Sequence, residues 1–582
     1  MPKTSKPAPP HKKHDKAAPY KKPVRKQAND KTFSAPASSA SASSASSRGQ
    51  QQKQQRIERQ KQQPTGELKV VARKQWEELR RGDLDPEVRK TKMASMMALI
   101  QGRIKEITFK HDMSRVVQTC LKYGNQEQRA LIAEELDGSY VDLSRSTYGR
   151  HILLRMLKYC PKQRPNIIRS FYGNVRKLVR HKDAAPVLEE CYAVFANAAQ
   201  RWDLVAEFYG NEFAVFKGGD NQNGSLEAVL EKHPLKRATI LSALKATVTP
   251  LLEKGTVQYS IVHRALLDYM KHADAKERQE VIEAMRELVV EVLHTRDGAH
   301  VGMLCLLYGT PKDRKAIVKS MKPFLRKICC EEYGYAVLIE ALDCIDDTVF
   351  MSKSVLQDIV GSDMAGELLA NQYGRRVPLY VLSGRNPLYV GSDALKVLAA
   401  GDSVRAETSK KDPEMRYREL RAHISPKMVE WVAANASTAL FEPFLSQAVS
   451  ETLLHADGDK TLAWQAVREL IADDFLKVLT DPVANRVVTN CIKASDAYAA
   501  DVLETLVSSA GSDNDNGEKE EEKGRRLEAA ACAGAFPVRA LLESAATGER
   551  TKSLLAASSN SIRQAMDGVE RKRTFEAILG CL

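Results

Sequence analysis

The sequence has few aromatic residues and no long apolar run, and these absences narrow the classes of protein to which it can belong. Aromatic side chains make up 6% of the 582 residues, while Ala, Leu and Val are abundant, a composition that suits helices better than sheets. No stretch of 18 apolar residues occurs and no apolar segment follows the N-terminus, so we expect neither a membrane span nor secretion. The ten cysteines include no C-x-x-C pair, which predicts reduced core thiols in the cytosol or nucleus.

Motifs that carry catalysis or hold cofactors are also absent. The sequence contains no G-x-x-x-x-G-K-[S/T], no H-E-x-x-H and no G-x-S-x-G, and its twelve His do not pair with Cys at zinc-binding spacing. We therefore predict a protein that is not an enzyme and that has no cofactor or metal. Acidic residues are too few to balance the basic ones. The resulting net charge of +14 favours a polyanionic partner, nucleic acid before an anionic membrane.

The sequence does contain an apolar helix signature that recurs about every 35–40 residues. Two adjacent apolar residues are followed four positions later by a second pair, as in Val116/Val117 and Cys120/Leu121. This spacing places one apolar stripe on an α-helix, and the fixed period predicts an all-α solenoid of stacked helices. A repeat of this length fits armadillo, HEAT, tetratricopeptide or Pumilio proteins. Signatures start at Ser114, Arg150, Ala185, Tyr259, Ala299, Tyr335 and Arg375 and, after a lapse of the period, at Asn485 and Ala535.

Composition divides the chain into four segments. Residues 1–66 are a basic, low-complexity tail that we expect to be disordered, acting as a nuclear-targeting or RNA-contacting segment or simply as a solubilising one. Residues 67–215 and 216–400 hold N-terminal and central repeats, with a polar insertion around GGDNQNGS. Residues 401–582 are a degenerate continuation of the repeats, interrupted by an exposed acidic loop at 509–525.

Residues at the start of each signature distinguish between the repeat families. In the Pumilio (Puf) pattern a small residue precedes a base-edge residue, a stacking residue, two apolar residues and a second base-edge residue. HDMSRVVQTCLKYG resembles this pattern closely, and YGRHILL follows it. Together with GRIKEITFKHD and SYVDLSRSTYGRHILL, these segments resemble the nucleolar Puf-A/Penguin branch, which includes fungal ribosome-assembly Puf proteins. The resemblance extends from Gln75 to Cys581 and is strongest up to Leu157.

This resemblance implies a right-handed α-solenoid with two arms in an L shape, present as a monomer in the nucleus and nucleolus. It implies binding to RNA or DNA, largely through the backbone, in maturation of the large ribosomal subunit. The implied partners are pre-rRNA, mRNA and pre-ribosomal proteins, and fungal members are also linked to mRNA localisation and translational repression.

Base recognition by a Puf repeat requires polar side chains at the two outer places and a flat or cationic group between them. Ser114, Arg115 and Gln118 meet the requirement, although Arg115 could instead pair with a carboxylate of the neighbouring repeat. Most other copies carry apolar residues at these places, so we do not expect one base per repeat. The further candidate contacts are stacking residues His151, His300 and Arg376, phosphate or guanine partners Arg150 and Arg375, and a partial set at Asn485, Arg486 and Thr489.

Basic clusters favour contact with the nucleic-acid backbone, although Lys is common on the solvent face of any solenoid. Arg176, Lys177 and Arg180 precede a signature helix and are the strongest cluster, and KYCPKQR contributes Lys158, Lys162 and Arg164. The alternative is a protein–protein scaffold of armadillo or HEAT type that does not bind nucleic acid. A lining rich in Lys and Arg would indicate nucleic acid, whereas an apolar or acidic lining would indicate the scaffold.

Overall fold

The computed structural model describes residues 66–211, 224–361, 364–507, 525–566 and 572–582. Contacts divide the chain into a unit of residues 1–71 and a unit of residues 72–582. The described part of the first unit is the beginning of helix α2 (Gly66–Leu79), and the second unit holds all other described elements. The predicted tail, apart from Gly66, and the acidic loop, apart from Arg525, lie outside the described residues. Throughout the part of the chain that the structure describes, every regular element is helical, which confirms the predicted all-α class.

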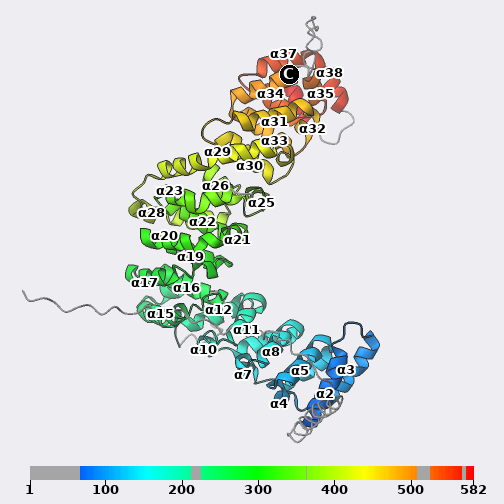
Figure 1. The fold of residues 1–582 in the computed structure, drawn as a ribbon, viewed down its shortest axis with the longest axis vertical. Coiled ribbons are helices and arrows are strands. Elements are labelled where there is room, and N and C mark those ends of the chain that lie inside the picture. The colour runs from blue at the N-terminus through cyan, green and yellow to red at the C-terminus, as the bar shows by residue number, and fades with distance from the viewer. Residues whose placement is uncertain (1–65, 212–223, 362–363, 508–524, 567–571) are drawn as a thin grey trace, which may run out of the picture. The chain divides into compact units, whose positions relative to one another are not determined.

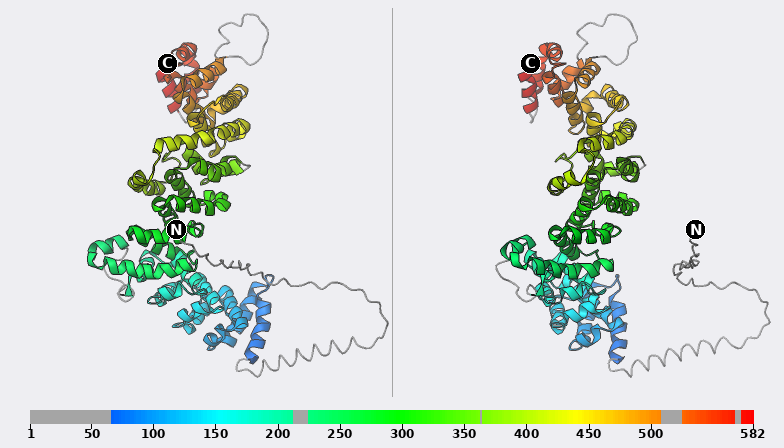
Figure 2. Two further views of the ribbon diagram at one scale, coloured as in Figure 1. Left: turned by 60° about the vertical axis from the view of Figure 1, so that its left-hand side comes forward. Right: turned by 90° about the vertical axis from the view of Figure 1, so that its left-hand side faces the viewer.

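The signature helices form one continuous row in which each helix packs against the next (Figure 1). Two further views show the same succession from α5 towards α36 (Figure 2). The predicted L shape, the handedness and the segment boundaries at residues 215 and 400 stay predictions. The row consists of α5 (His111–Tyr123), α8 (Gly149–Tyr159), α11 (Ala185–Glu190) with the π-helical turn η2 (Cys191–Phe195), α16 (Ser260–His272), α19 (Arg296–Tyr308), α22 (Gly334–Cys344), α26 (Arg376–Ser383), α30 (Leu445–His455), α33 (Ala484–Ala494), α36 (Phe536–Glu543) and α39 (Arg573–Cys581).

Further helices pack around this row and complete the repeats. In the N-terminal part they are α3 (Pro86–Ile100), α4 (Ile104–Thr108), α6 (Gln126–Glu135), α7 (Tyr140–Arg145), α9 (Arg164–Ser170), α10 (Val175–Leu178) and α12 (Ala198–Ala206). In the centre they are α14 (Leu226–Lys232), α15 (Arg237–Glu253), α17 (Ala275–Met285), α18 (Val289–Val292), α20 (Pro311–Met321), α21 (Leu325–Cys330), α23 (Thr348–Met351), α24 (Gln357–Val360) and α25 (Met364–Ala370). Further on they are α31 (Thr461–Asp473), α32 (Phe475–Thr480), α34 (Asp496–Val507), α35 (Arg525–Cys532), α37 (Gly548–Leu555) and α38 (Ser559–Met566).

The prediction that the period lapses between Arg375 and Asn485 is wrong, because α30 occupies the row between α26 and α33. On α30 the two pairs of the signature are Ala448/Val449 and Thr452/Leu453. Because Ala448 is small and Thr452 is polar, the apolar stripe is hard to recognise in the sequence. The interval before α30 contains α27 (Ser392–Ala400), α28 (Asp402–Thr408) and the long helix α29 (Pro413–Ala439).

Local sequence explains how each repeat folds. The apolar stripe of α5 is fully buried, from Val116 at 1% exposure to Leu121 at 0%. The next helix, α6, begins with a capping box in which Asn125 and Gln128 satisfy each other's backbone N–H groups. Gly149 at the start of α8 permits close packing of successive helices, because a Cβ there would lie 2.9 Å from the carbonyl oxygen of Leu143.

An arginine four residues after the cap ties the end of a signature helix to its neighbours. Arg129 donates from Nε to the carbonyl of Leu121 at 2.8 Å and lies 5.2 Å from the centre of the Tyr159 ring in the next repeat. A cation that bonds the last carbonyls of a helix also opposes the negative end of its dipole. The bond to the preceding helix end recurs at Arg164, Arg201, Arg278 and Arg314, and Arg164 and Arg278 also lie over an aromatic ring of the next repeat.

Candidate nucleic-acid interface

The two base-edge positions and the stacking position at the start of each signature helix differ strongly in exposure along the row. On α5 and α8, the predicted stacking residues Arg115 and His151 are exposed. The guanidinium of Arg115 makes no hydrogen bond or ion pair with the described residues, so its predicted alternative role in a carboxylate pair is not seen there. Both side chains are therefore available to a ligand in this part of the row.

Ser114 does not lie on the exposed surface, which corrects its prediction as a base-edge residue. Its side chain is buried, with 1% exposure, and its hydroxyl donates to the carbonyl oxygen of Tyr148 at 3.0 Å. The half-buried Gln118 donates from Nε2 to the Ser114 hydroxyl at 3.1 Å. Ser114 thus links α5 to the start of α8, and Gln118 bonds Ser114 from within the same helix.

Basic side chains gather beside Arg115 on the two neighbouring helices. Arg115 and Lys122 are seven residues apart on α5, while His151, Arg155 and Lys158 follow the spacing i, i+4, i+7 on α8. Residues with these spacings share one side of a helix, and α5 packs directly against α8. We name these five residues the α5–α8 cationic face. Lys122 and Arg155 were not among the predicted contacts, although the i, i+4, i+7 spacing was visible in the sequence.

The electrostatics of the face agree with a concentration of positive charge. The pKa of Tyr123 is lowered, first because Lys122 Nζ donates to its hydroxyl at 2.8 Å, with the charges of Arg89 and Arg155 adding to the effect. The pKa of His151 is also lowered, first by burial and then by Arg150 and Arg155. His151 therefore reaches the face as a mainly neutral ring near pH 7, suited to stacking rather than to charge pairing.

The other predicted N-terminal contacts are largely engaged in the fold. Arg150 is half-buried and pairs with Asp183 at 3.3 Å. Arg176 donates to the carbonyl of Phe208 and Arg180 to the carbonyl of Ala246, so both hold the packing of later helices. Within that predicted cluster, Lys177 and Arg180 are exposed and Arg176 is half-buried. Arg164, predicted as a phosphate contact, instead bonds the carbonyl of Leu157 at the end of α8.

In the central repeats, the predicted contact residues bind other parts of the chain. His300 Nε2 lies 3.0 Å from a carboxylate oxygen of Asp393 on α27. Arg376 lies over the rings of Tyr335 and Tyr373, with its guanidinium carbon 4.6 and 5.3 Å from their centres. Arg375 donates to Gln447 at 2.9 Å and stacks on Phe444 at 3.9 Å. Other side chains of the protein thus occupy the bonding and stacking partners' positions that RNA bases would need at these three residues.

The places predicted to be incapable of base recognition are buried here. Ile339 on α22 and Met303 on α19 have 0% and 1% exposure. On α16 the second base-edge place holds His263, which is also buried, with Nδ1 2.6 Å from the hydroxyl of Thr295 and Nε2 2.7 Å from the carbonyl of Val257. The row becomes accessible again at α33, where Arg486 and Lys493 are exposed while Asn485 and Thr489 are half-buried.

Other kinds of site find no support in the part of the chain that the structure describes. No group of three or more His, Cys, Asp or Glu is arranged to hold a metal ion there. Nor does any described helix combine the length and apolarity needed to cross a bilayer. All ten cysteines are unpaired, and burial raises the pKa of the Cys305 and Cys120 thiols to about 12, which makes them unreactive.

Comparison with known proteins identifies relatives of this architecture. The model of the Pumilio-family RNA binding repeat matches residues 114–136, and that of the CPL (NUC119) domain matches residues 370–478. Pumilio homolog 3 of Rattus norvegicus is 41% identical over 408 residues, 70% of this chain and 62% of the relative. Pumilio homology domain family member 6 of Schizosaccharomyces pombe is 37% identical over 415 residues, 70% of this chain and 64% of the relative. The chain thus matches slightly less than two thirds of the length of these relatives.

Solved structures extend the similarity over nearly the whole chain. The crystal structure of human Puf-A has a TM-score of 0.77 and 34% identity, covering 89% of this chain and 100% of that one. Human Puf-A in complex with DNA gives the same score and identity, covering 88% of this chain and 99% of that one. With this coverage and the row of signature helices, the chain belongs to the Pumilio-repeat family, in the branch that includes Puf-A.

Proposed function

We propose that this protein binds nucleic acid through the phosphate backbone, using the α5–α8 cationic face. The observation that carries the proposal is the composition of α8, which places His151, Arg155 and Lys158 on this face and contains no acidic residue. Lys and Arg at this density neutralise phosphates and release condensed counterions, which supplies most sequence-independent affinity. The crystal structure of the related human Puf-A in complex with DNA supports the same class of ligand.

Backbone contact is favoured over base recognition because few signature places can read a base edge. Ser114 and Gln118 bond each other, and the places on α19 and α22 are buried. A sequence-specific Puf protein needs exposed polar pairs on successive repeats. We therefore infer weak sequence preference, with Arg115 and His151 stacking on whichever bases pass them.

We further propose that the ligand in the cell is pre-rRNA of the large ribosomal subunit, bound in the nucleolus together with pre-ribosomal proteins, and that binding to mRNA is secondary. The similarity to the Puf-A branch and the basic charge of the chain support this setting. We propose that the protein acts as a monomer and as a binding protein rather than an enzyme. Co-purification of pre-rRNA with the tagged protein from nuclear extract would test the setting, and recovery of mature rRNA alone would contradict it.

The binding proposal is tested by charge reversal on the face. The double variant Arg115→Glu/Lys158→Glu should weaken binding of every single-stranded RNA sequence alike. It should also lower the slope of log K against log salt by about 1.4, since each lost phosphate contact contributes about 0.7 for single strands. Fluorescence anisotropy at several salt concentrations measures both quantities. Lys319→Glu on α20, an exposed residue away from the face, is the matched control.

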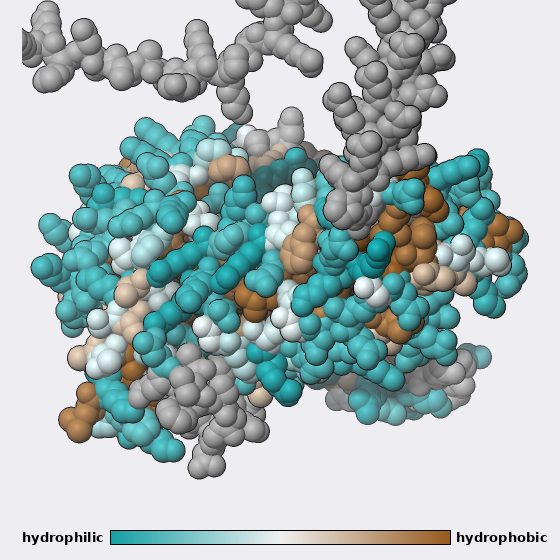
Figure 3. All heavy atoms as spheres, turned by 90° about the horizontal axis from the view of Figure 1, so that it is seen from below, coloured by the Kyte–Doolittle hydropathy of each residue, from teal (hydrophilic) through white to brown (hydrophobic). Residues whose placement is uncertain are grey.

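A protein–protein scaffold would behave differently. It would show salt-insensitive, negligible RNA binding in the unmodified chain and no difference between the two variants. The surface seen from below in Figure 3 is mostly hydrophilic, and its apolar residues lie in separate patches rather than in one continuous docking face. Loss of binding for one RNA sequence only would contradict backbone recognition.

A further inference from the structure

The segment of residues 385–408, which contains α27 and α28, lies along the signature face of α19 and α22. Its first attachment is at the N-terminal end of α19, where Arg296 Nε donates to Asp393 at 2.7 Å and His300 contacts the same carboxylate. The hydroxyl of Tyr335 on α22 accepts a hydrogen bond from the backbone N–H of Gly391 at 3.3 Å. Gly391 permits this approach, since a Cβ there would lie 2.8 Å from that hydroxyl.

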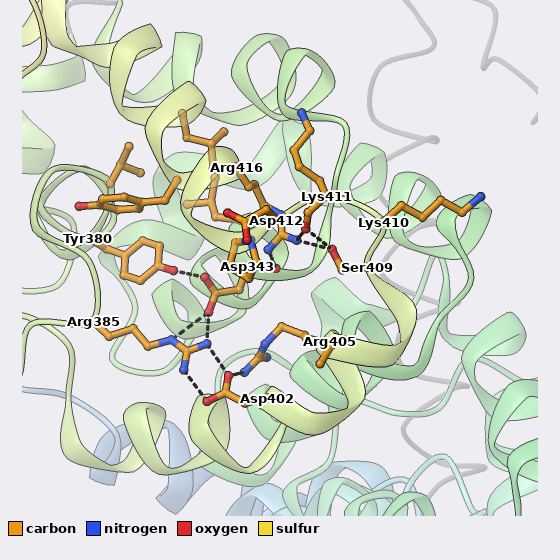
Figure 4. A pocket seen from close by; sticks show the side chains of 16 residues that line it. Asp343, Tyr380, Arg385, Asp402, Arg405, Ser409, Lys410, Lys411, Asp412 and Arg416 are labelled. Atoms are coloured by element: carbon orange, nitrogen blue, oxygen red, sulfur yellow. Dashed lines mark hydrogen bonds and ion pairs between the residues drawn. The ribbon is translucent and has the colours of Figure 1, made fainter.

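The second attachment is at the opposite end of the same helices and is built from ion pairs, one of them buried. Arg405 on α28 donates to Glu340 on α22 at 2.6 Å, and both side chains are almost wholly buried. Arg385 bridges Asp343 and Asp402 at 2.8 Å each, while the hydroxyl of Tyr380 also bonds Asp343 (Figure 4). Apart from Glu340, these groups line a cavity of about 490 Å³, and the carboxylates of Asp343 and Asp402 already have partners inside the protein.

Between the two attachments the contact is apolar. α28 packs against α19, and a Cβ on Gly401 would lie 3.1 Å from the side chain of Leu307. His300, Met303 and Leu307 follow one another at i, i+3 and i+7, so the two residues in contact with the segment lie on one face of α19 with the buried Met303 between them. Polar base-edge residues at these places would be buried without partners beneath the segment, at a cost of about 1–3 kcal/mol each. This explains why the Puf reading pattern is lost here.

We propose that the α27–α28 segment permanently occupies the reading face of α19 and α22, and that nucleic acid is thereby excluded from these two helices and binds at the uncovered α5–α8 cationic face. This inference rests on the proposed function and specifies where along the row the ligand binds. The carboxylate of Asp393, held by Arg296 and His300, takes the place that a phosphate would take on an open repeat. His300 is accordingly a positioning residue for the segment and does not contact RNA.

The location is tested with the full chain and a single-stranded RNA carrying 4-thiouridine. Photocrosslinked peptides are mapped by mass spectrometry, and amide hydrogen exchange is measured with and without the RNA. We expect crosslinks and protection within residues 111–159, and neither within residues 296–344 or 385–408. Crosslinks in residues 296–344, or faster exchange of residues 385–408 when RNA is added, would overturn this inference but not the proposed function. Absence of crosslinks and protection everywhere would overturn the proposed function as well.

A second variant tests whether the segment is what excludes the ligand. Asp393→Lys places a cation beside Arg296, so α27 should exchange its amides about tenfold faster and crosslinks should appear in residues 296–308. Lys396→Glu changes an exposed charge on the same helix and should leave both readouts as in the unmodified chain. Unchanged exchange in Asp393→Lys would show that Asp393 does not hold the segment. Faster exchange without new crosslinks would show that the segment does not exclude RNA.

Discussion

Replacing His263 should remove a specific part of the acid sensitivity of the fold. The imidazole is buried on α16, where both ring nitrogens are bonded, to the Thr295 hydroxyl and the Val257 carbonyl. Burial, with a smaller contribution from His294, lowers the pKa of His263 to about 3. The unfolded chain therefore binds a proton on this residue far more readily than the folded protein does.

The sign and size of the effect follow from linkage. Because the folded pKa lies below the unfolded value of about 6.5, the contribution is complete above pH 6.5 and is lost as pH falls towards 3. At pH 5 the unfolded state gains about 2 kcal/mol from protonation, whereas at pH 7 it gains a few tenths or less. The side chain of Gln cannot take up this proton. Between pH 7 and pH 5, the free energy of unfolding should therefore fall by about 2 kcal/mol less in His263→Gln than in the unmodified protein.

Urea unfolding followed by circular dichroism at pH 7 and pH 5 measures this difference. His423→Gln, at an exposed position on α29, serves as the matched control and should behave as the unmodified protein does. The variant is expected to be less stable at pH 7, since Gln fills the site imperfectly. The reasoning is refuted if His263→Gln and the unmodified protein lose the same free energy between the two pH values.

Two further substitutions separate structural from RNA-binding roles. Arg164→Gln loses its bonds to the end of α8 and its contact with the Phe195 ring, so the free energy of unfolding should fall by about 1–3 kcal/mol in urea titrations. Its RNA affinity at the same salt concentration should change less than twofold, and a larger loss would restore Arg164 as a phosphate contact. Ser114→Ala should cost about 1 kcal/mol through the lost bond to Tyr148. It should leave binding to A-rich and U-rich RNA equally strong, and a selective loss for A-rich RNA would contradict the assignment.

Local patterns predicted the parts of this fold that depend on neighbours in sequence. The apolar stripes identified most of the signature helices. The helix α30 was missed because Thr452 stands where an apolar residue is expected, and its partners on α26 and α33 supply the burial. Its place in the row therefore follows from its packing between α26 and α33 and not from its own sequence.

The candidate site was harder to predict because exposure depends on distant contacts. Ser114 and Arg115 are adjacent in sequence, yet one bonds a carbonyl in the next repeat and the other faces solvent. Asp393 meets His300 across more than ninety residues of chain, and no period in the sequence links them. Basic spacing on α8, in contrast, is a local property that the sequence displays, although Arg155 was not among the predicted contacts.

The recurring arginine after each helix cap also determines how the chain should respond to mechanical load. Arg129 connects α6 to the end of α5 and to a ring of the following repeat, and Arg164 and Arg278 do the same further along. Four residues after the cap Asp347 stands Met351, but the end of α22 is bonded instead by Arg416, four residues after the cap Asp412 of α29. After α30 the corresponding residue is Trp464, so the solenoid, pulled from its ends, should yield first beyond α29, in small steps. The arginine-linked repeats before it should resist together and rupture as one cooperative block.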